Sequence, residues 1–177
     1  MIEKRLYRAA FAVYALLLFW AIMFKCNMLI GDLFFGFRSI TLIPFYTIIR
    51  NAISDGEIGF GFFVETIGNI AVFVPLGVLL PLGGRKMDFG RVTLISAGVS
   101  IFFEVLQYTI AFGSSDITDV IMNTAGGMLG FALWRLFGSK LKPKYINIIL
   151  AVLTALGAII FVSGAVDTAI RFDKYFI

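Results

Sequence analysis

The sequence lacks histidine altogether and contains a single cysteine, Cys26. One cysteine cannot form an internal disulfide bond, and a chain without histidine can have neither cysteine/histidine catalysis nor a histidine-ligated metal site. Charge is also scarce, because Asp, Glu, Lys and Arg make up only 15% of the 177 residues. Soluble domains have about 25% charged residues, so this composition is not that of an ordinary soluble domain.

Long apolar runs take the place of charge, since 60% of the residues are hydrophobic and the mean hydropathy is +0.96. A hydrocarbon core about 30 Å thick requires about 20 mainly apolar residues for each helical span. Stretches that meet this requirement are Leu6–Phe24, Glu65–Leu82, Arg91–Phe112, Ile117–Phe137 and Tyr145–Gly164. The sequence therefore predicts an all-α fold, a polytopic bundle of about five transmembrane helices in one membrane domain over residues 1–177.

The first apolar run follows basic residues, as the apolar core of a secretory signal peptide does. It ends, however, in Trp20, Phe24 and Lys25 and not in a small-residue cleavage site. We therefore expect an uncleaved membrane anchor.

Lysine and arginine are distributed unevenly among the predicted loops. Ten of the 15 fall on one side of a five-span arrangement, namely Lys4, Arg5, Arg8, Arg85, Lys86, Arg91, Arg135, Lys140, Lys142 and Lys144. Because basic residues are retained on the cytoplasmic side, we expect a cytoplasmic N-terminus and a C-terminus outside the cell. We interpret these basic loops as topology signals, in preference to a lipid-binding surface, and we expect no nucleic-acid partner.

The connection over residues 25–64 is long and rich in aromatic side chains, which favour the headgroup region of a bilayer. Within it, Pro44 stands where a helix could begin, with Ser39 or Thr41 near the cap. We expect a short interfacial helix on the outer face. Two interpretations of the segment stay open: a membrane-anchoring loop, or a lid over whatever the helices enclose.

Polar and small residues form stripes on the second, third and fourth spans at about 100° per residue. The stripe of the fourth span consists of Asp116, Asp119, Asn123, Gly127, Gly130 and Trp134. That of the third consists of Thr93, Ala97, Ser100, Glu104, Gln107 and Ala111, and the second contributes Glu65, Gly68 and Asn69. Such stripes face protein, so these three spans should form the core, with the first and fifth as a lipid-facing flank.

Depth in the membrane distinguishes the acidic residues. With the third span ending near Phe112, Glu104 would lie roughly 12 Å inside, where a charged group costs about 2.5 kcal/mol or more. It must therefore be protonated, paired or in contact with water. Asp116 and Asp119 stand in the first turn of the fourth span, where helix capping is the alternative to a role in a site.

Four segments share their order with a known family: "RSITLIPF" (38–45), "NIAVFVPLG" (69–77), "EVLQ" (104–107) and "DITDVIMNTAGGMLG" (116–130). This order resembles the VanZ-like family, small bacterial membrane proteins named for a determinant of low-level teicoplanin resistance. The resemblance is strongest over residues 38–130, and the fifth span rests on hydropathy alone. Two departures are Thr41, where the family often has asparagine, and Gly113 or Ser114, where many members have arginine.

The resemblance implies a multi-pass protein of the bacterial cell membrane that contributes to glycopeptide resistance. We expect an outward-facing polar pocket that binds the antibiotic, a lipid headgroup or a cell-wall precursor. The candidate ligand-binding residues are Arg38, Glu65, Asn69, Glu104, Gln107, Asp116, Asp119 and Asn123. No cofactor and no resident metal are expected, and membrane lipid is an expected partner.

Three other interpretations remain. In an enzyme, a hydrolase or transferase acting on a lipid or cell-wall substrate, Glu104 would be a general base and Asp116 and Asp119 ligands of a hard cation. In a proton or ion relay, Glu104 would carry the charge, although the inner half of the bundle lacks ionisable groups to continue it. The last interpretation is a purely structural role.

Overall fold

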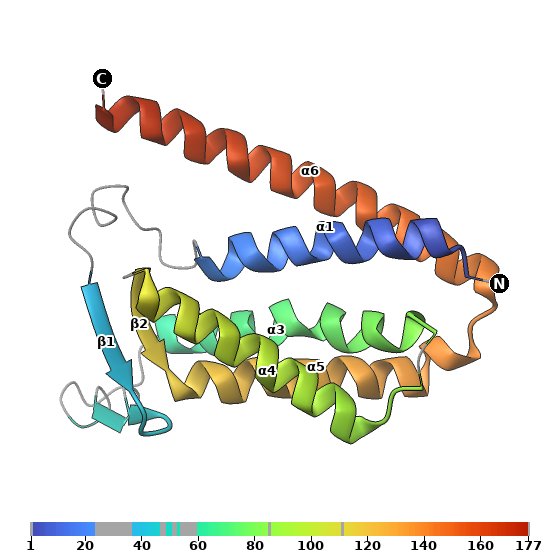
Figure 1. Ribbon diagram of the computed structural model, residues 1–177, viewed down its shortest axis with the longest axis horizontal. Helices are drawn as coiled ribbons and strands as arrows, with labels where there is room; N and C mark the ends of the chain where they lie inside the picture. Colours follow the sequence, from blue (N-terminus) through green and yellow to red (C-terminus); the bar gives the residue numbers. More distant parts are fainter. Residues whose placement is uncertain are drawn as a thin grey trace.

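The computed structural model describes residues 2–23, 37–46, 49–50, 53, 60–84, 86–110 and 112–176. Its elements, in chain order, are α1 (Lys4–Met23), β1 (Phe37–Thr41), α3 (Phe60–Leu82), α4 (Phe89–Thr109), β2 (Phe112–Asp116), α5 (Ile117–Leu136), η2 (Gly138–Lys140) and α6 (Pro143–Phe176) (Figure 1). Within the described residues, five helices are long and apolar enough to cross a membrane. The predicted all-α polytopic bundle is confirmed.

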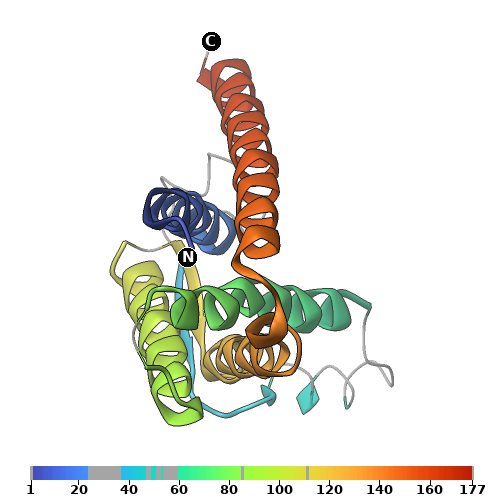
Figure 2. The ribbon, with the colours of Figure 1, turned by 90° about the vertical axis from the view of Figure 1, so that its right-hand side faces the viewer.

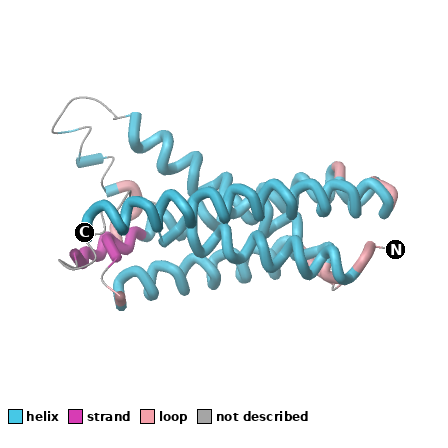
Figure 3. The backbone as a smooth tube through the Cα atoms, turned by 90° about the horizontal axis from the view of Figure 1, so that it is seen from above, coloured by secondary structure: helices cyan, strands magenta, loops and turns pink. Residues whose placement is uncertain are grey.

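The long helices run along a common direction, so the bundle has two ends (Figure 1). At one end α1, α4 and α6 begin and α3 and α5 finish; we call this the basic end, because most of the described lysines and arginines lie there. The opposite end carries β1 and β2, and we call it the strand end (Figure 3). Seen along the bundle, α3 lies in the middle, with α1 and α6 on one side and α5 on the other (Figure 2).

The closest helix pair is α3 and α5, which meet through glycines. A methyl group placed on Gly130 would overlap the carbonyl oxygen of Val74, and one on Gly126 would overlap that of Ile70. Gly126 and Gly130 are four residues apart and therefore face the same neighbour. Small residues at such positions allow two backbones to approach, which is how helices gain van der Waals contact in a membrane.

The expectation that α1 would be only a lipid-facing flank is incomplete. Leu18, Ile22 and Met23 of α1 are buried in one cluster with Phe73 of α3 and Phe103 of α4. The hydroxyl of Tyr14 also donates to the carbonyl oxygen of Val72 at 3.0 Å. The strand-end half of α1 is therefore part of the core, whereas α6 packs mainly on α1.

The strand pair was not predicted from the sequence. β1 and β2 are parallel, with Phe37 opposite Phe112 and Thr41 opposite Asp116. The predicted third span, Arg91–Phe112, was wrong at its end, because α4 stops at Thr109 and the residues from Phe112 onward form ladder bonds with β1. The ladder brings two loops together across the strand end of the bundle (Figure 1).

The segment after Pro44 agrees with the predicted interfacial helix where it is described. Tyr46, Ile49, Arg50 and Ile53 are helical, and the backbone amide of Ile49 donates to the carbonyl oxygen of Phe45 at 3.0 Å. Large apolar side chains of this region are exposed, among them Leu42, Ile43, Ile49 and Ile53. Most of residues 25–59, on which the lid interpretation depends, lie outside the described residues.

Candidate functional site

Asp116 caps α5, which is one of the two roles that remained open for it at the start of the fourth span. Its backbone is extended, with φ −126° and ψ 124°, and its Oδ1 accepts a hydrogen bond from the amide of Thr118 at 2.7 Å. An N-terminal helix end leaves several amides without intrahelical partners, and this carboxylate satisfies one of them. The hydroxyl of Thr118 in turn accepts a hydrogen bond from the amide of Phe45 at 2.9 Å. The cap therefore also holds the loop that follows β1.

Glu104 of α4 lies directly beneath this cap. Its side chain is buried, and its Oε2 accepts a hydrogen bond from the amide of Asp116 at 3.0 Å. Its carbonyl oxygen accepts a second bond from the hydroxyl of Ser115 at 2.8 Å. These two hydrogen bonds join α4 to the residues that lead into α5.

The depth predicted for Glu104 requires correction. Because α4 ends at Thr109, Glu104 is five residues from the helix end, or about 7 Å along the axis and not 12 Å. The hydrogen bond from the Asp116 amide offsets part of the cost of burying this side chain.

Asn69 and Asp119 connect α3 to α5 at the same end. The Asn69 amide group donates to Oδ1 of Asp119, and the Asn69 side chain is buried. Asp119 lies in the first turn of α5, so capping was its alternative role. Its contact with Asn69 links α5 to α3. This link lies nearer the strand end than the glycines at which the two backbones touch.

Asn123 occupies the next buried position, between α5 and α4. Its Nδ2 donates to the hydroxyl of Ser100 at 2.9 Å, and both residues are almost completely inaccessible. Within the described part of the chain, Oδ1 of Asn123 and the hydroxyl of Ser96 have no hydrogen-bond partner. Ser96 was missed by the sequence interpretation, although it precedes Ser100 by one turn on α4.

The remaining predicted site residues are Gln107, Glu65 and Arg38. Nε2 of Gln107 donates to the carbonyl oxygen of Ile22 at 3.1 Å, so Gln107 contacts α1. Glu65 is exposed on α3, one turn before Asn69. Arg38 lies in β1 with Gly113 opposite it in β2, and its side chain is outside the described set. The structure thus brings together Glu104 with Asp116, Asn69 with Asp119, and Asn123 with Ser100.

A pocket of 260 Å³ opens beside Glu104 and Asp116. Polar groups in its lining come from Glu104, Tyr108, Ser115 and Asp116. The remaining walls are apolar and come from β1 and the loop after it, from α4 and from α5: Ile40, Leu42, Ile101, Val105, Ile117 and Val120. The surface of the pocket is therefore almost entirely hydrocarbon, with Glu104 and Asp116 at its edge, which suits a mainly apolar ligand that carries a polar group at one end.

The acidic residues do not form a metal cluster in the part of the chain that the structure describes. No three of its aspartate, glutamate or cysteine side chains converge as metal ligands would. The two carboxylates that the enzymatic interpretation assigned to a hard cation are bonded to other groups, Asp116 to the Thr118 amide and Asp119 to Asn69.

Comparison with known protein families decides what kind of chain this is. A family model, VanZ/LLP1, matches residues 11–138. The chain belongs to the VanZ/LLP1 family. The match extends from α1 to η2, so the VanZ/LLP1 region holds both strands and every candidate site residue, while α6 lies beyond it. The resemblance found in the sequence motifs is therefore confirmed.

A similar member of the VanZ/LLP1 family is Protein VanZ of Enterococcus faecium. It is 33% identical to this chain over 145 residues, which are 81% of this chain and 83% of that protein. A search of solved structures found no match.

Proposed function

We propose that this membrane protein contributes to glycopeptide resistance by binding a ligand in the pocket at the strand end. The observation that carries the proposal is the position of Glu104 and Asp116, two carboxylates hydrogen-bonded to backbone amides at the edge of an otherwise apolar pocket. Family membership and similarity to Protein VanZ support the resistance role. The candidate ligands are the antibiotic, a lipid headgroup and a cell-wall precursor.

The chemistry of the pocket favours a ligand with hydrogen-bond donors beside a hydrocarbon chain. Carboxylates accept hydrogen bonds and attract cations, so an ammonium, hydroxyl or amide group would pair with them. Only Oδ1 of Asp116 is engaged in the cap, and a carboxylate has about four acceptor sites in total. The walls from Ile101, Val105 and Val120 would contact an acyl chain. A lipoglycopeptide such as teicoplanin has both features.

A binding role predicts that the charge of Asp116 and Glu104, the two carboxylates of the pocket, matters and not merely their shape. Asp116→Asn keeps an oxygen for the Thr118 amide, and Glu104→Gln keeps an oxygen for the Asp116 amide. Each variant should therefore insert and fold, yet lower teicoplanin resistance in a sensitive host to the level of the empty vector. The measurement is the inhibitory concentration of teicoplanin, with vancomycin compared in parallel and the amount of membrane protein determined for each variant.

The matched control for these variants is Asp88→Asn. Asp88 is exposed at the basic end, where it caps α4 and pairs with Arg91 at 3.2 Å. Asparagine caps a helix as well as aspartate, so this variant removes one negative charge far from the pocket at little cost. Full resistance in both site variants would show that the carboxylates are only structural, and the binding proposal would then be wrong.

We further propose that the basic end faces the cytoplasm, with the N-terminus inside and the C-terminus outside. The described basic residues at that end are Lys4, Arg5, Arg8, Lys86, Arg91, Arg135, Lys140, Lys142 and Lys144. This asymmetry is the one by which loops are oriented during insertion. In a variant without Cys26, an impermeant thiol reagent should label a cysteine added at the C-terminus of intact cells and leave Lys86→Cys unlabelled. The reverse pattern would invert the topology.

A further inference from the structure

A second cavity lies on the opposite side of α3 from the candidate site. It has a volume of 540 Å³ and is bounded by α1, α3, α5 and α6, and we call it the lipid-side groove. It exists because α6 packs mainly on α1 and leaves space between itself and α3 and α5. Figure 1 shows α6 diverging from the rest of the bundle. The volume is within the range of about 300 to 1,000 Å³ of small-molecule sites.

The interior of the lipid-side groove suits hydrocarbon. Its walls are mainly aliphatic, with Val13, Val78 and Leu153 as examples from three of the helices. The hydroxyls within it are already satisfied by backbone, that of Tyr14 by Val72 at 3.0 Å and that of Thr154 by Leu150 at 2.6 Å. A polar occupant would therefore lose its own hydrogen bonds on entry, whereas an acyl chain would lose none.

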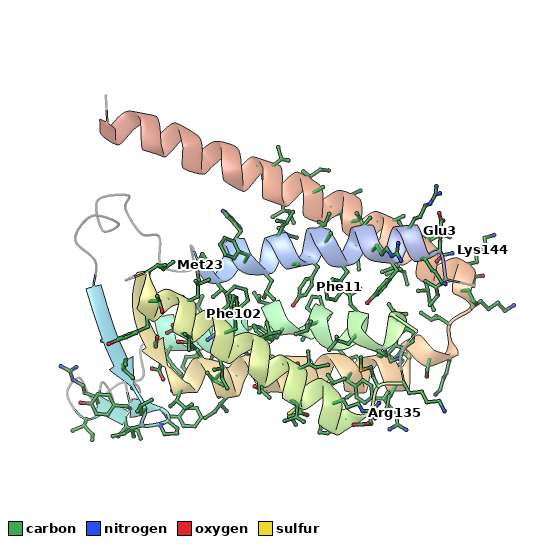
Figure 4. The ribbon with its side chains drawn as sticks, in the orientation of Figure 1. Glu3, Phe11, Met23, Phe102, Arg135 and Lys144 are labelled. Atoms are coloured by element: carbon green, nitrogen blue, oxygen red, sulfur yellow. The ribbon has the colours of Figure 1, made fainter. Side chains whose placement is uncertain are left out.

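Basic residues are sequence neighbours of the residues that close one end of the groove. Gly138 and Leu141 close it at the η2–α6 connection, and Lys140 and Lys142 stand on either side of Leu141 in the sequence, both exposed. Lys144 follows in the first turn of α6, and Figure 4 shows it with Arg135 at the same end of the bundle. Clusters of this kind attract anionic lipid headgroups.

Little negative charge is available nearby to neutralise these lysines. Asp88 and Glu3 are the described acids at the basic end; Asp88 is paired with Arg91 at 3.2 Å, and Glu3 lies near Lys144 at the start of α6 (Figure 4). Trp134 also lines the groove, and its ring lies against Gly138. Tryptophan favours the boundary between hydrocarbon and headgroups, so the boundary should lie near this level.

We propose that the lipid-side groove is a binding site for an anionic phospholipid, with an acyl chain between α1, α3, α5 and α6 and the phosphate at Lys140 and Lys142. The site is separate from the pocket beside Glu104 and belongs to the opposite end of the bundle. Charge at its rim selects the headgroup, and the apolar interior accepts the chain.

Trp134 provides the measurement, because the chain has two tryptophans and Trp20→Phe leaves only the one in the groove. The full chain in a neutral detergent is titrated with phosphatidylglycerol that carries brominated acyl chains, and Trp134 fluorescence is recorded. The same titration is done with brominated phosphatidylcholine. We expect quenching at about tenfold lower mole fraction of the anionic lipid, since each nearby lysine adds to its affinity.

Two sets of variants test the contributions of the basic rim and of the apolar interior to lipid binding. Lys140→Gln with Lys142→Gln should remove the preference for phosphatidylglycerol, whereas Lys86→Gln, the same kind of substitution at a single position before α4, should preserve it. Val78→Phe should weaken quenching by both lipids because it fills the groove. Ile148→Phe, on a half-exposed position of α6 outside the groove, is its control. Circular dichroism and gel filtration check that each variant is folded.

Other outcomes would overturn the proposal. Equal quenching by the two lipids in the parent protein would mean that the groove accepts any bilayer lipid without selection. A preference for phosphatidylglycerol that survives the double lysine variant would place the headgroup elsewhere. Absence of quenching by either lipid, together with a dimer on gel filtration, would mean that a second copy of the chain covers the groove.

Discussion

Replacing Gly130 by alanine should separate α3 from α5. The added methyl carbon would lie 2.9 Å from the carbonyl carbon of Val74 and 3.1 Å from Cα of Gly77, and it would overlap the Val74 oxygen. The overlap with the Val74 oxygen is the closest of these contacts, and α5 must move outward by about 1 Å to relieve it. Backbone atoms cannot rotate aside as a side chain can, and the strain is therefore shared along the whole contact.

The expected cost of Gly130→Ala is about 1 to 3 kcal/mol of stability, as for other overpacked interiors. Unfolding should be followed in detergent by temperature, with circular dichroism as the signal. The same movement would pull Asp119 away from Asn69, so resistance should fall together with stability.

Gly98 supplies the control, because a methyl group placed there would have nothing within 4 Å. Gly98→Ala should be neutral or stabilising by up to about 1 kcal/mol, since alanine favours helix more than glycine does. Equal unfolding temperatures for the two variants would refute the close approach of α3 and α5.

Five further variants test individual contacts. Asp116→Ala removes the α5 cap and should cost about 0.5 to 2 kcal/mol in thermal unfolding, whereas Asp116→Asn should cost almost nothing. Ser96→Ala should leave stability unchanged or raise it, because the buried hydroxyl has no partner among the described residues, and Ser100→Ala should lower it by leaving the Asn123 amide unpaired. Tyr14→Phe should cost about 0.5 to 1.5 kcal/mol by removing the bond to Val72, and an unaltered unfolding temperature would show that this bond contributes nothing.

The helices were predictable because the thickness of the bilayer sets a minimum length for a spanning helix, and the apolar runs reach that length. The ends of the helices were less predictable. The predicted third span continued to Phe112 because those residues are apolar enough, yet α4 ends at Thr109. What ends it is the pairing of Phe112–Asp116 with Phe37–Thr41, a contact between residues distant in the chain that no local pattern contains.

The candidate site was predictable where a residue's role follows from its own helix. Asp116 stood at a helix start, and Asn69 and Asp119 lay on facing stripes, so the cap and the convergence of these two stripes could be expected. The partner of Gln107 could not be predicted. Its stripe on the third span is broad enough to face two neighbouring helices, and the sequence does not show which of the two helices Gln107 contacts. In the structure Gln107 contacts α1.

The parallel ladder between β1 and β2 also constrains the order in which the molecule is built. About 70 residues separate the end of β1 from the start of β2, which is a delay of about 4 to 14 s at ribosomal rates of about 5 to 20 residues per second. Throughout that interval β1 remains unpaired while α3 and α4 enter the bilayer. The pocket beside Glu104 is consequently the last part of this region to close, and a nascent chain interrupted after α4 would expose an unpaired strand at the membrane surface.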